Sequence, residues 1–240
     1  MITLEIVAST VQSCINAEKG GAKRIELCSA LKTAGVTPSA GLIRAVKAHV
    51  SIPVYVMIRP REGDFIYSNS EVEVMKRDIE ISLECGADGL VFGVLNDNNQ
   101  VDSKLLRDLI SRCGQAPVTF HRAFDVTAHP DEALETIIES GCKRILTSGC
   151  MPGCLQGRET LHRLAEMASG RIGILPGGGI TVDTISEIFH PLIKEYHMSA
   201  RSPIKSAAPE VIFETDYEET DEGKVRQVIS LANDFFSRLQ

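Results

Sequence analysis

The sequence predicts an α/β protein with the (β/α)8 TIM-barrel fold, formed by a single domain over residues 1–240. Short runs rich in β-branched residues alternate with amphipathic segments from end to end, and eight such pairs can be counted. The length is close to the roughly 250 residues that this fold typically needs. A doubly wound open sheet is the alternative, but no Gly-x-Gly-x-x-Gly motif follows the first predicted strand. No linker or low-complexity segment divides the chain.

Each predicted strand is a short apolar run. The eight runs are Thr3–Val7, Arg24–Cys28, Val54–Ile58, Gly89–Phe92, Val118–His121, Arg144–Thr147, Ile172–Leu175 and Glu195–Met198. Glycine-containing turns such as Gly20-Gly21-Ala22 precede several of them, because glycine suits the left-handed position that ends a helix. The segment Glu71–Cys85 is typical of the predicted helices, with apolar residues at helical spacing and charged residues facing away.

The chain departs from this repeat after the eighth strand. The acidic segment Pro209–Gly223 is predicted to be a surface excursion. An extra C-terminal helix follows it, and the apolar face of that helix comprises Val225, Val228, Ile229, Ala232, Phe235, Phe236 and Leu239. This face must be buried either against the barrel or against a second subunit, so we expect a homo-oligomer, a dimer or tetramer. A scaffold protein that self-associates through this helix is one reading of the chain.

The composition limits the partners and the compartment. There are 25 Lys and Arg against 32 Asp and Glu, a net charge of -7, which argues against nucleic-acid and membrane partners. No apolar run reaches the roughly 18 residues of a membrane span, and the N-terminus shows no signal-like core. The seven cysteines are an odd number and are spread across predicted helices and strands. We therefore expect reduced thiols and a cytoplasmic protein.

Two arginines, Arg59 and Arg61, follow the third predicted strand at alternate positions. Alternation along a strand would place both side chains on one face, where an anion between them would relieve their repulsion. Solvated surface arginines are the alternative. The pattern predicts an anion clamp for a carboxylate or phosphate.

Two glutamates, Glu5 and Glu26, interrupt apolar strands, which is costly unless each is paired. Arg24, Arg59 and Arg122 are the natural partners. One reading is a structural layer of ion pairs inside the barrel, and the other is an anion-binding or acid/base pocket. The candidates for acid/base catalysis are Glu5, Glu26 and His121. His197, at the end of the eighth strand, could also transfer protons, although histidines at strand ends are often structural.

Polar groups also follow the last three strands, and such barrels often bind phosphate after the seventh and eighth. Gly177-Gly178-Gly179 is predicted to open a helix whose free amides could bind an anion, or else to form only a tight turn. The remaining candidate ligand-binding residues are Ser148, His197 and Arg201, beside Arg122.

Thiols are the candidate metal ligands. Cys28 ends the second strand, and the segment Cys150-Met151-Pro152-Gly153-Cys154 places two thiols and a thioether together after the sixth. Soft ligands of this kind select Cu(I). The Cys-x3-Cys spacing is equally typical of two unrelated loop cysteines.

The chain resembles the copper homeostasis protein CutC family over nearly its whole length. The matching stretches include Arg24-Ile25-Glu26-Leu27-Cys28-Ser29, Val56-Met57-Ile58-Arg59-Pro60-Arg61, Thr119-Phe120-His121-Arg122-Ala123-Phe124-Asp125, Arg144-Ile145-Leu146-Thr147-Ser148-Gly149 and His197-Met198-Ser199-Ala200-Arg201. The resemblance implies a cytoplasmic TIM barrel assigned to copper handling, with copper ion bound by some members. It brings no established reaction with it.

This chain departs from the family pattern at two places. Some copper-associated members have a cysteine at the end of strand one, where this chain has Val7, and Cys28 matches the second family cysteine. A two-thiolate site across strands one and two cannot form here, which leaves Cys150 and Cys154 as substitutes. His197-Met198 also stands where His-Gly is more usual.

Two functions therefore remain open. The resemblance implies a copper homeostasis protein that binds copper. The residues at the strand ends equally suit a barrel enzyme or binding protein for a small anionic metabolite, phosphorylated or carboxylated. Whether the chain is an enzyme is not decided by the sequence.

Overall fold

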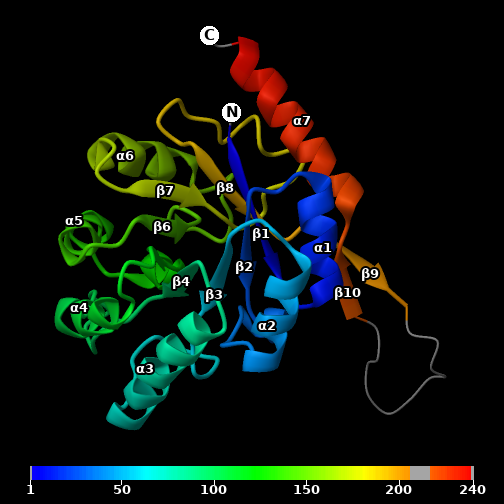
Figure 1. The fold of residues 1–240 in the computed structure, drawn as a ribbon. Helices are drawn as coiled ribbons and strands as arrows, with labels where there is room; N and C mark the ends of the chain where they lie inside the picture. The colour runs from blue at the N-terminus through cyan, green and yellow to red at the C-terminus, as the bar shows by residue number, and fades with distance from the viewer. Residues whose placement is uncertain (1, 206–216, 239–240) are drawn as a thin grey trace.

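The computed structural model of the chain describes residues 2–205 and 217–238. Eight parallel strands form one sheet in the order β7-β6-β5-β4-β3-β2-β1-β8, with helices around its outside (Figure 1). The strands are β1 (Thr3–Ala8), β2 (Arg24–Leu27), β3 (Val54–Met57), β4 (Gly89–Phe92), β5 (Val118–Phe120), β6 (Arg144–Thr147), β7 (Gly173–Pro176) and β8 (Glu195–Met198). A parallel bridge between Gly177 and His197 joins the two outermost strands of that order and nearly closes the barrel. The predicted TIM-barrel fold is confirmed.

Helices connect most of the strands. They are α1 (Val11–Gly20), η1 (Leu31–Thr33), α2 (Ala40–His49), α3 (Asn69–Glu84), α4 (Ser103–Arg112), η2 (Arg122–Val126), α5 (Pro130–Ser140), α6 (Arg158–Ala168) and α7 (Glu222–Arg238). Helix α3 begins with a capping box between Ser68 and Glu71, which satisfies amide groups that the first helical turn leaves free. Its buried residues Met75 and Ile79 recur at the predicted helical spacing. None of the described helices is long and apolar enough to cross a membrane.

One predicted helix is absent from the described part of the chain. Gly177-Gly178-Gly179 was expected to open a helix after β7, but residues 182–188 form successive turns instead. That expectation was wrong, and no helix dipole acts on the glycine amides. The glycines form a tight turn in which Gly178 and Gly179 have φ values of 108° and 81°. Other residues rarely adopt this backbone region.

The chain after β8 forms a hairpin that the sequence did not indicate. Strands β9 (Arg201–Ile204) and β10 (Tyr217–Thr220) pair antiparallel, so the end of the acidic segment is a strand rather than a loop. The rest of that segment up to residue 216 lies outside the described residues. Helix α7 then packs against α1 (Figure 1). Val225 and Val228 are buried there, whereas Leu231 and Phe235 stay exposed, and Leu239 lies outside the described residues.

Side chains alternate between the two sides of the barrel wall, as they must along a strand. In β1, Leu4 and Ile6 join the large core between the sheet and the helices. Val7 instead joins a small cluster inside the barrel, which also contains Cys28, Tyr55, Met57 and Val91. Glu5 therefore faces the barrel interior, where only pairing with other side chains makes a charge tolerable.

Candidate functional site

A cavity of about 380 Å³ opens at the carboxyl ends of the strands, where barrels of this fold place their ligands. We call it the mouth cavity. Residues from β1 to β3, β5, β6, β8 and the loop after β7 line it. Its charged and titratable lining residues are Glu26, Arg59, His121, Arg122, His197 and Arg201. Six of the residues that the sequence singled out are thus brought together.

A layer of ion pairs lies deeper in the barrel than this cavity. Arg24 forms ion pairs with both Glu5 and Glu195, and Arg144 binds Glu195 from the far side with a 3.1 Å Nε–Oε2 distance. Both guanidiniums also lie 5.0 Å from the centre of the Tyr55 ring. Arg24, one of the partners expected for the strand glutamates, thus pairs with Glu5, and an acid/base role of Glu5 stays a prediction. The sequence analysis missed Arg144, Glu195 and Tyr55, although each lies at an inward-facing position of a predicted strand.

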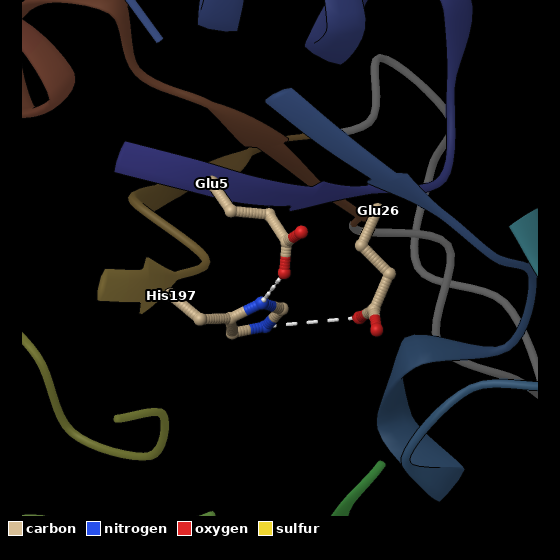
Figure 2. A group of neighbouring side chains, drawn as sticks. All are labelled: Glu5, Glu26 and His197. Carbon is tan, nitrogen blue, oxygen red and sulfur yellow. Dashed lines mark hydrogen bonds and ion pairs between the residues drawn. The ribbon is translucent and has the colours of Figure 1, made fainter. Parts of the chain in front are cut away.

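Glu5 also holds His197 in place. The two are register partners in β1 and β8, and Nδ1 of His197 lies 2.7 Å from Oε1 of Glu5 (Figure 2). Burial alone would raise the Glu5 pKa, but Arg24 and His197 outweigh it and lower that pKa to about 2. An ionised Glu5 can only accept hydrogen bonds, so Nδ1 of His197 carries the proton. Nε2 of His197 is then the atom that faces Glu26.

Glu26 has a different environment from Glu5. Its Oε2 atom lies 3.7 Å from Nε2 of His197, and its Oε1 atom has no hydrogen-bond partner (Figure 2). Burial raises the pKa of Glu26 to about 7, with the charge of Glu5 adding to the rise and His197 opposing it. The pKa of His197 is raised as well, because its two carboxylate neighbours outweigh burial. Glu26 therefore presents a carboxylate oxygen without a partner beside the imidazole of His197.

His121 is buried, with one ring nitrogen hydrogen-bonded and the other without a partner among the described residues. Burial, reinforced by the charge of Arg59, lowers the pKa of His121 to about 3. Its Nδ1 atom accepts the amide hydrogen of Ala123 at 3.2 Å, so the single proton resides on Nε2. Nε2 has no partner among the described residues. The geometry thus favours binding over the acid/base role that was considered for His121.

The two arginines after β3 do not form a clamp. Arg59 is only 3% exposed and donates to the main-chain carbonyls of Thr33, Gly35 and Gly63. Arg61 lies outside the mouth cavity, because its guanidinium binds carboxylates of the same loop and of α3. Strand β3 ends at Met57, so the alternation that predicted a shared face stops before either arginine. Of these two arginines, only Arg59 lines the cavity and remains a candidate ligand-binding residue.

Arg122 reaches the cavity from η2 and is fixed by two hydrogen bonds. Its Nε donates to Asp125 and its Nη2 donates to Ser148, each at 2.7 Å. Asp125 also accepts the amide hydrogens of Ser148 and Cys150, which makes it the organiser of the loop after β6. A Cβ on Gly178 would lie 3.3 Å from Nη1 of Arg122, a tight contact that a small shift of the arginine would relieve. Sequence reasoning quoted Asp125 but assigned it no role.

The family model of CutC matches residues 2–202 of this chain. The chain belongs to the CutC family. It is 50% identical over 200 residues to the human copper homeostasis protein cutC homolog, covering 83% of this chain and 73% of the relative. It is 42% identical over 234 residues to a family protein CutC of Xylella fastidiosa strain Temecula1, covering 95% of this chain and 88% of the relative.

The same family includes a solved structure. The crystal structure of the putative copper homeostasis protein CutC from Streptococcus agalactiae superimposes with a TM-score of 0.79 at 32% identity, covering 83% of this chain and 99% of that one. A thiamine phosphate pyrophosphorylase from Pyrococcus furiosus superimposes with a TM-score of 0.61 at 12% identity, covering 98% of this chain and 96% of that one. This likeness shows only that the two proteins share a fold.

The structure shows the surroundings of each candidate thiol of this CutC-family chain. Cys28 is fully buried beside Val7, and burial raises its thiol pKa. Burial likewise raises the pKa of Cys150 to about 11 and that of Cys154 to about 12, so both are protonated at neutral pH. Met151 is 49% exposed, whereas Cys154 is buried. The sulfur atoms therefore favour ordinary packing over copper ligation, because the thiolate is the form that binds a metal.

One group of side chains is suited to a metal ion. Among the described residues, the ligand atoms of Glu5, Glu26 and His197 lie within 4.8 Å of one another, and no cysteine belongs to such a group. Nδ1 of His197 is taken by Glu5, which leaves Nε2 of His197 and the carboxylate of Glu26 to face an ion. A carboxylate that binds the other nitrogen of a ligating histidine is the usual arrangement in metal sites.

Proposed function

We propose that this CutC-family chain acts in copper homeostasis in the cytoplasm and binds a copper ion at the mouth of the barrel, through Nε2 of His197 and the carboxylate of Glu26. The observation that carries the proposal is the buried Glu26 oxygen without a partner, next to a histidine whose tautomer is fixed. The cytoplasmic location is inferred from the seven free cysteines.

The distance between the two ligand atoms fits a shared ion. Two atoms that each bind a metal at about 2 Å lie about 3 to 4 Å apart, and Nε2 and Oε2 are 3.7 Å apart. Glu5 would orient the imidazole and neutralise Arg24 behind it. The remaining coordination positions would open into the mouth cavity.

The nature of the donors favours one oxidation state. Imidazole and carboxylate are nitrogen and oxygen ligands, which suit Cu(II), whereas Cu(I) prefers thiolates and thioethers. Burial raises the pKa of the Cys28 and Cys154 thiols, which favours their protonated form. We therefore expect this site to prefer Cu(II).

Equilibrium titration with Cu(II) tests the proposal. Replacing the ligand in His197→Gln, or its partner in Glu26→Gln, is expected to weaken copper binding at least about tenfold. Cys28→Ser should leave the affinity unchanged. His190→Gln is the matched histidine control, because His190 lies near the surface against His162.

The reverse pattern would overturn the site. If Cys28→Ser or the double change Cys150→Ser, Cys154→Ser abolishes copper binding while His197→Gln binds normally, thiols are the ligands. Circular dichroism of each variant checks that a lost affinity does not reflect unfolding.

A further inference from the structure

Four cavity-lining residues carry buried polar atoms with no partner among the described residues. These atoms are Oε1 of Glu26, Nε of Arg59, Nε2 of His121 and Nε of Arg201. Buried polar atoms in native proteins nearly always have a partner, so a cluster of exceptions around one cavity points to a ligand.

Besides Nε of Arg59, two of the unpartnered atoms are donors. Nε2 of His121 carries its proton because Nδ1 accepts from Ala123. Nε of Arg201 is free because the described ion pair of that guanidinium runs through Nη1 to Glu218. Both donors belong to side chains that line the mouth cavity.

Further donors line the same cavity. Nη1 of Arg122 makes no hydrogen bond within the described residues and lies close to Gly178. The amides of Gly178 and Gly179 likewise donate to no described acceptor. They follow β7, one of the two places where barrels of this fold commonly bind phosphate.

The charge of the cavity also calls for an anion. Arg59 is buried, and its described hydrogen bonds end on neutral carbonyl groups. No carboxylate among the described residues lies within ion-pair distance of it. A buried cation without a counter-ion is costly, and an anionic ligand would offset that cost.

We propose that the mouth cavity binds a small metabolite through an oxyanion, a phosphate or a carboxylate, which accepts hydrogen bonds from His121, Arg122, Arg201 and the amides of Gly178 and Gly179. The cavity volume of about 380 Å³ is that of a small-molecule site and leaves room for a short organic portion beside the oxyanion. This ligand site does not depend on copper, since its donors differ from the proposed copper ligands.

The test uses full-length protein kept metal-free with a chelator. Isothermal titration is carried out with inorganic phosphate, with glycerol phosphate as a phosphate monoester, and with succinate as a carboxylate, each up to about 10 mM. Binding of glycerol phosphate or succinate identifies the class of oxyanion. Failure of all three probes to bind overturns the proposal.

Three arginine variants locate the site. Arg122→Met and Arg201→Met should each weaken the bound probe about tenfold, because each removes a charged hydrogen bond. Arg61→Met is the matched control: it removes the same charge outside the cavity and should change nothing. Equal weakening by all three variants would mean general charge attraction or an adventitious ion only, and would overturn the site.

Copper titrations of the same variants separate this proposal from the copper site. Arg122→Met should not weaken Cu(II) binding, since it removes a cation, whereas Glu26→Gln should weaken Cu(II) but not the anion. The rise in unfolding temperature that a bound probe causes in the unchanged protein is a second readout. It needs no variant and therefore does not depend on how the variants fold.

Discussion

Replacing Glu26 with glutamine isolates the cost of an ionised carboxylate inside the barrel. The pKa of Glu26 is raised from 4.5 to about 7, mainly by burial. A group with a raised pKa favours the folded state fully below its unfolded value, and this contribution is lost as pH rises through the folded value. Ionised Glu26 therefore lowers the free energy of unfolding above pH 7.

The size of this effect follows from the shift. A rise from 4.5 to about 7 corresponds to a loss of about 3 kcal/mol. Glutamine has the shape of the protonated acid and never ionises. Glu26→Gln should therefore match the unchanged protein at about pH 5 and be more stable by up to about 3 kcal/mol at about pH 9.

Urea denaturation of both proteins at the two pH values measures this difference directly. Glu62→Gln, at an exposed glutamate, is the control and should show no such pH dependence. The same stability difference between Glu26→Gln and the unchanged protein at both pH values would refute the reasoning, because it would mean that Glu26 titrates normally.

Three further changes test the surrounding groups. His121 stabilises the folded state above pH 6.5, and this contribution is lost as pH falls toward its folded pKa of about 3. In urea denaturation near pH 4, His121→Asn should therefore reduce the acid-induced loss of unfolding free energy by up to about 3 kcal/mol. The same acid-induced loss in the variant and the unchanged protein contradicts this. Glu5→Gln should destabilise the fold by about 3–5 kcal/mol at neutral pH, since it leaves Arg24 with one carboxylate partner fewer, and a loss below about 1 kcal/mol would show that the pair contributes little. Gly89→Ala should cost about 1–3 kcal/mol in the same assay, because its Cβ would lie 2.6 Å from the Tyr55 ring, and a neutral effect would show that the ring moves freely.

The fold could be predicted closely because its signal is local. Apolar runs separated by amphipathic segments located all eight barrel strands within one or two residues at each end. The β9–β10 hairpin was missed because its two strands are far apart in sequence and the second, Tyr217–Thr220, is mostly acidic. The prediction of a helix after Gly177-Gly178-Gly179 was wrong because a run of glycines suits a tight turn as well as the start of a helix.

The site could be predicted as a set of residues but not as a set of contacts. Which glutamate forms ion pairs depends on the register of the strands. Arg24 of β2 and His197 of β8 both lie beside Glu5 of β1, whereas Glu26 of β2 lies opposite Val7. The sequence carries no local signal for that difference. Oligomeric state also stays a prediction, since the described part of α7 packs on α1 and leaves only part of its apolar face exposed.

The central claim is that copper binds at the mouth of the barrel through imidazole and carboxylate groups. X-ray absorption spectroscopy of the Cu(II)-loaded protein measures the ligand atoms directly. A first shell of nitrogen and oxygen with an imidazole signal that disappears in His197→Gln is the predicted result. A first shell that contains sulfur would contradict the claim, and so would an imidazole signal that persists in His197→Gln.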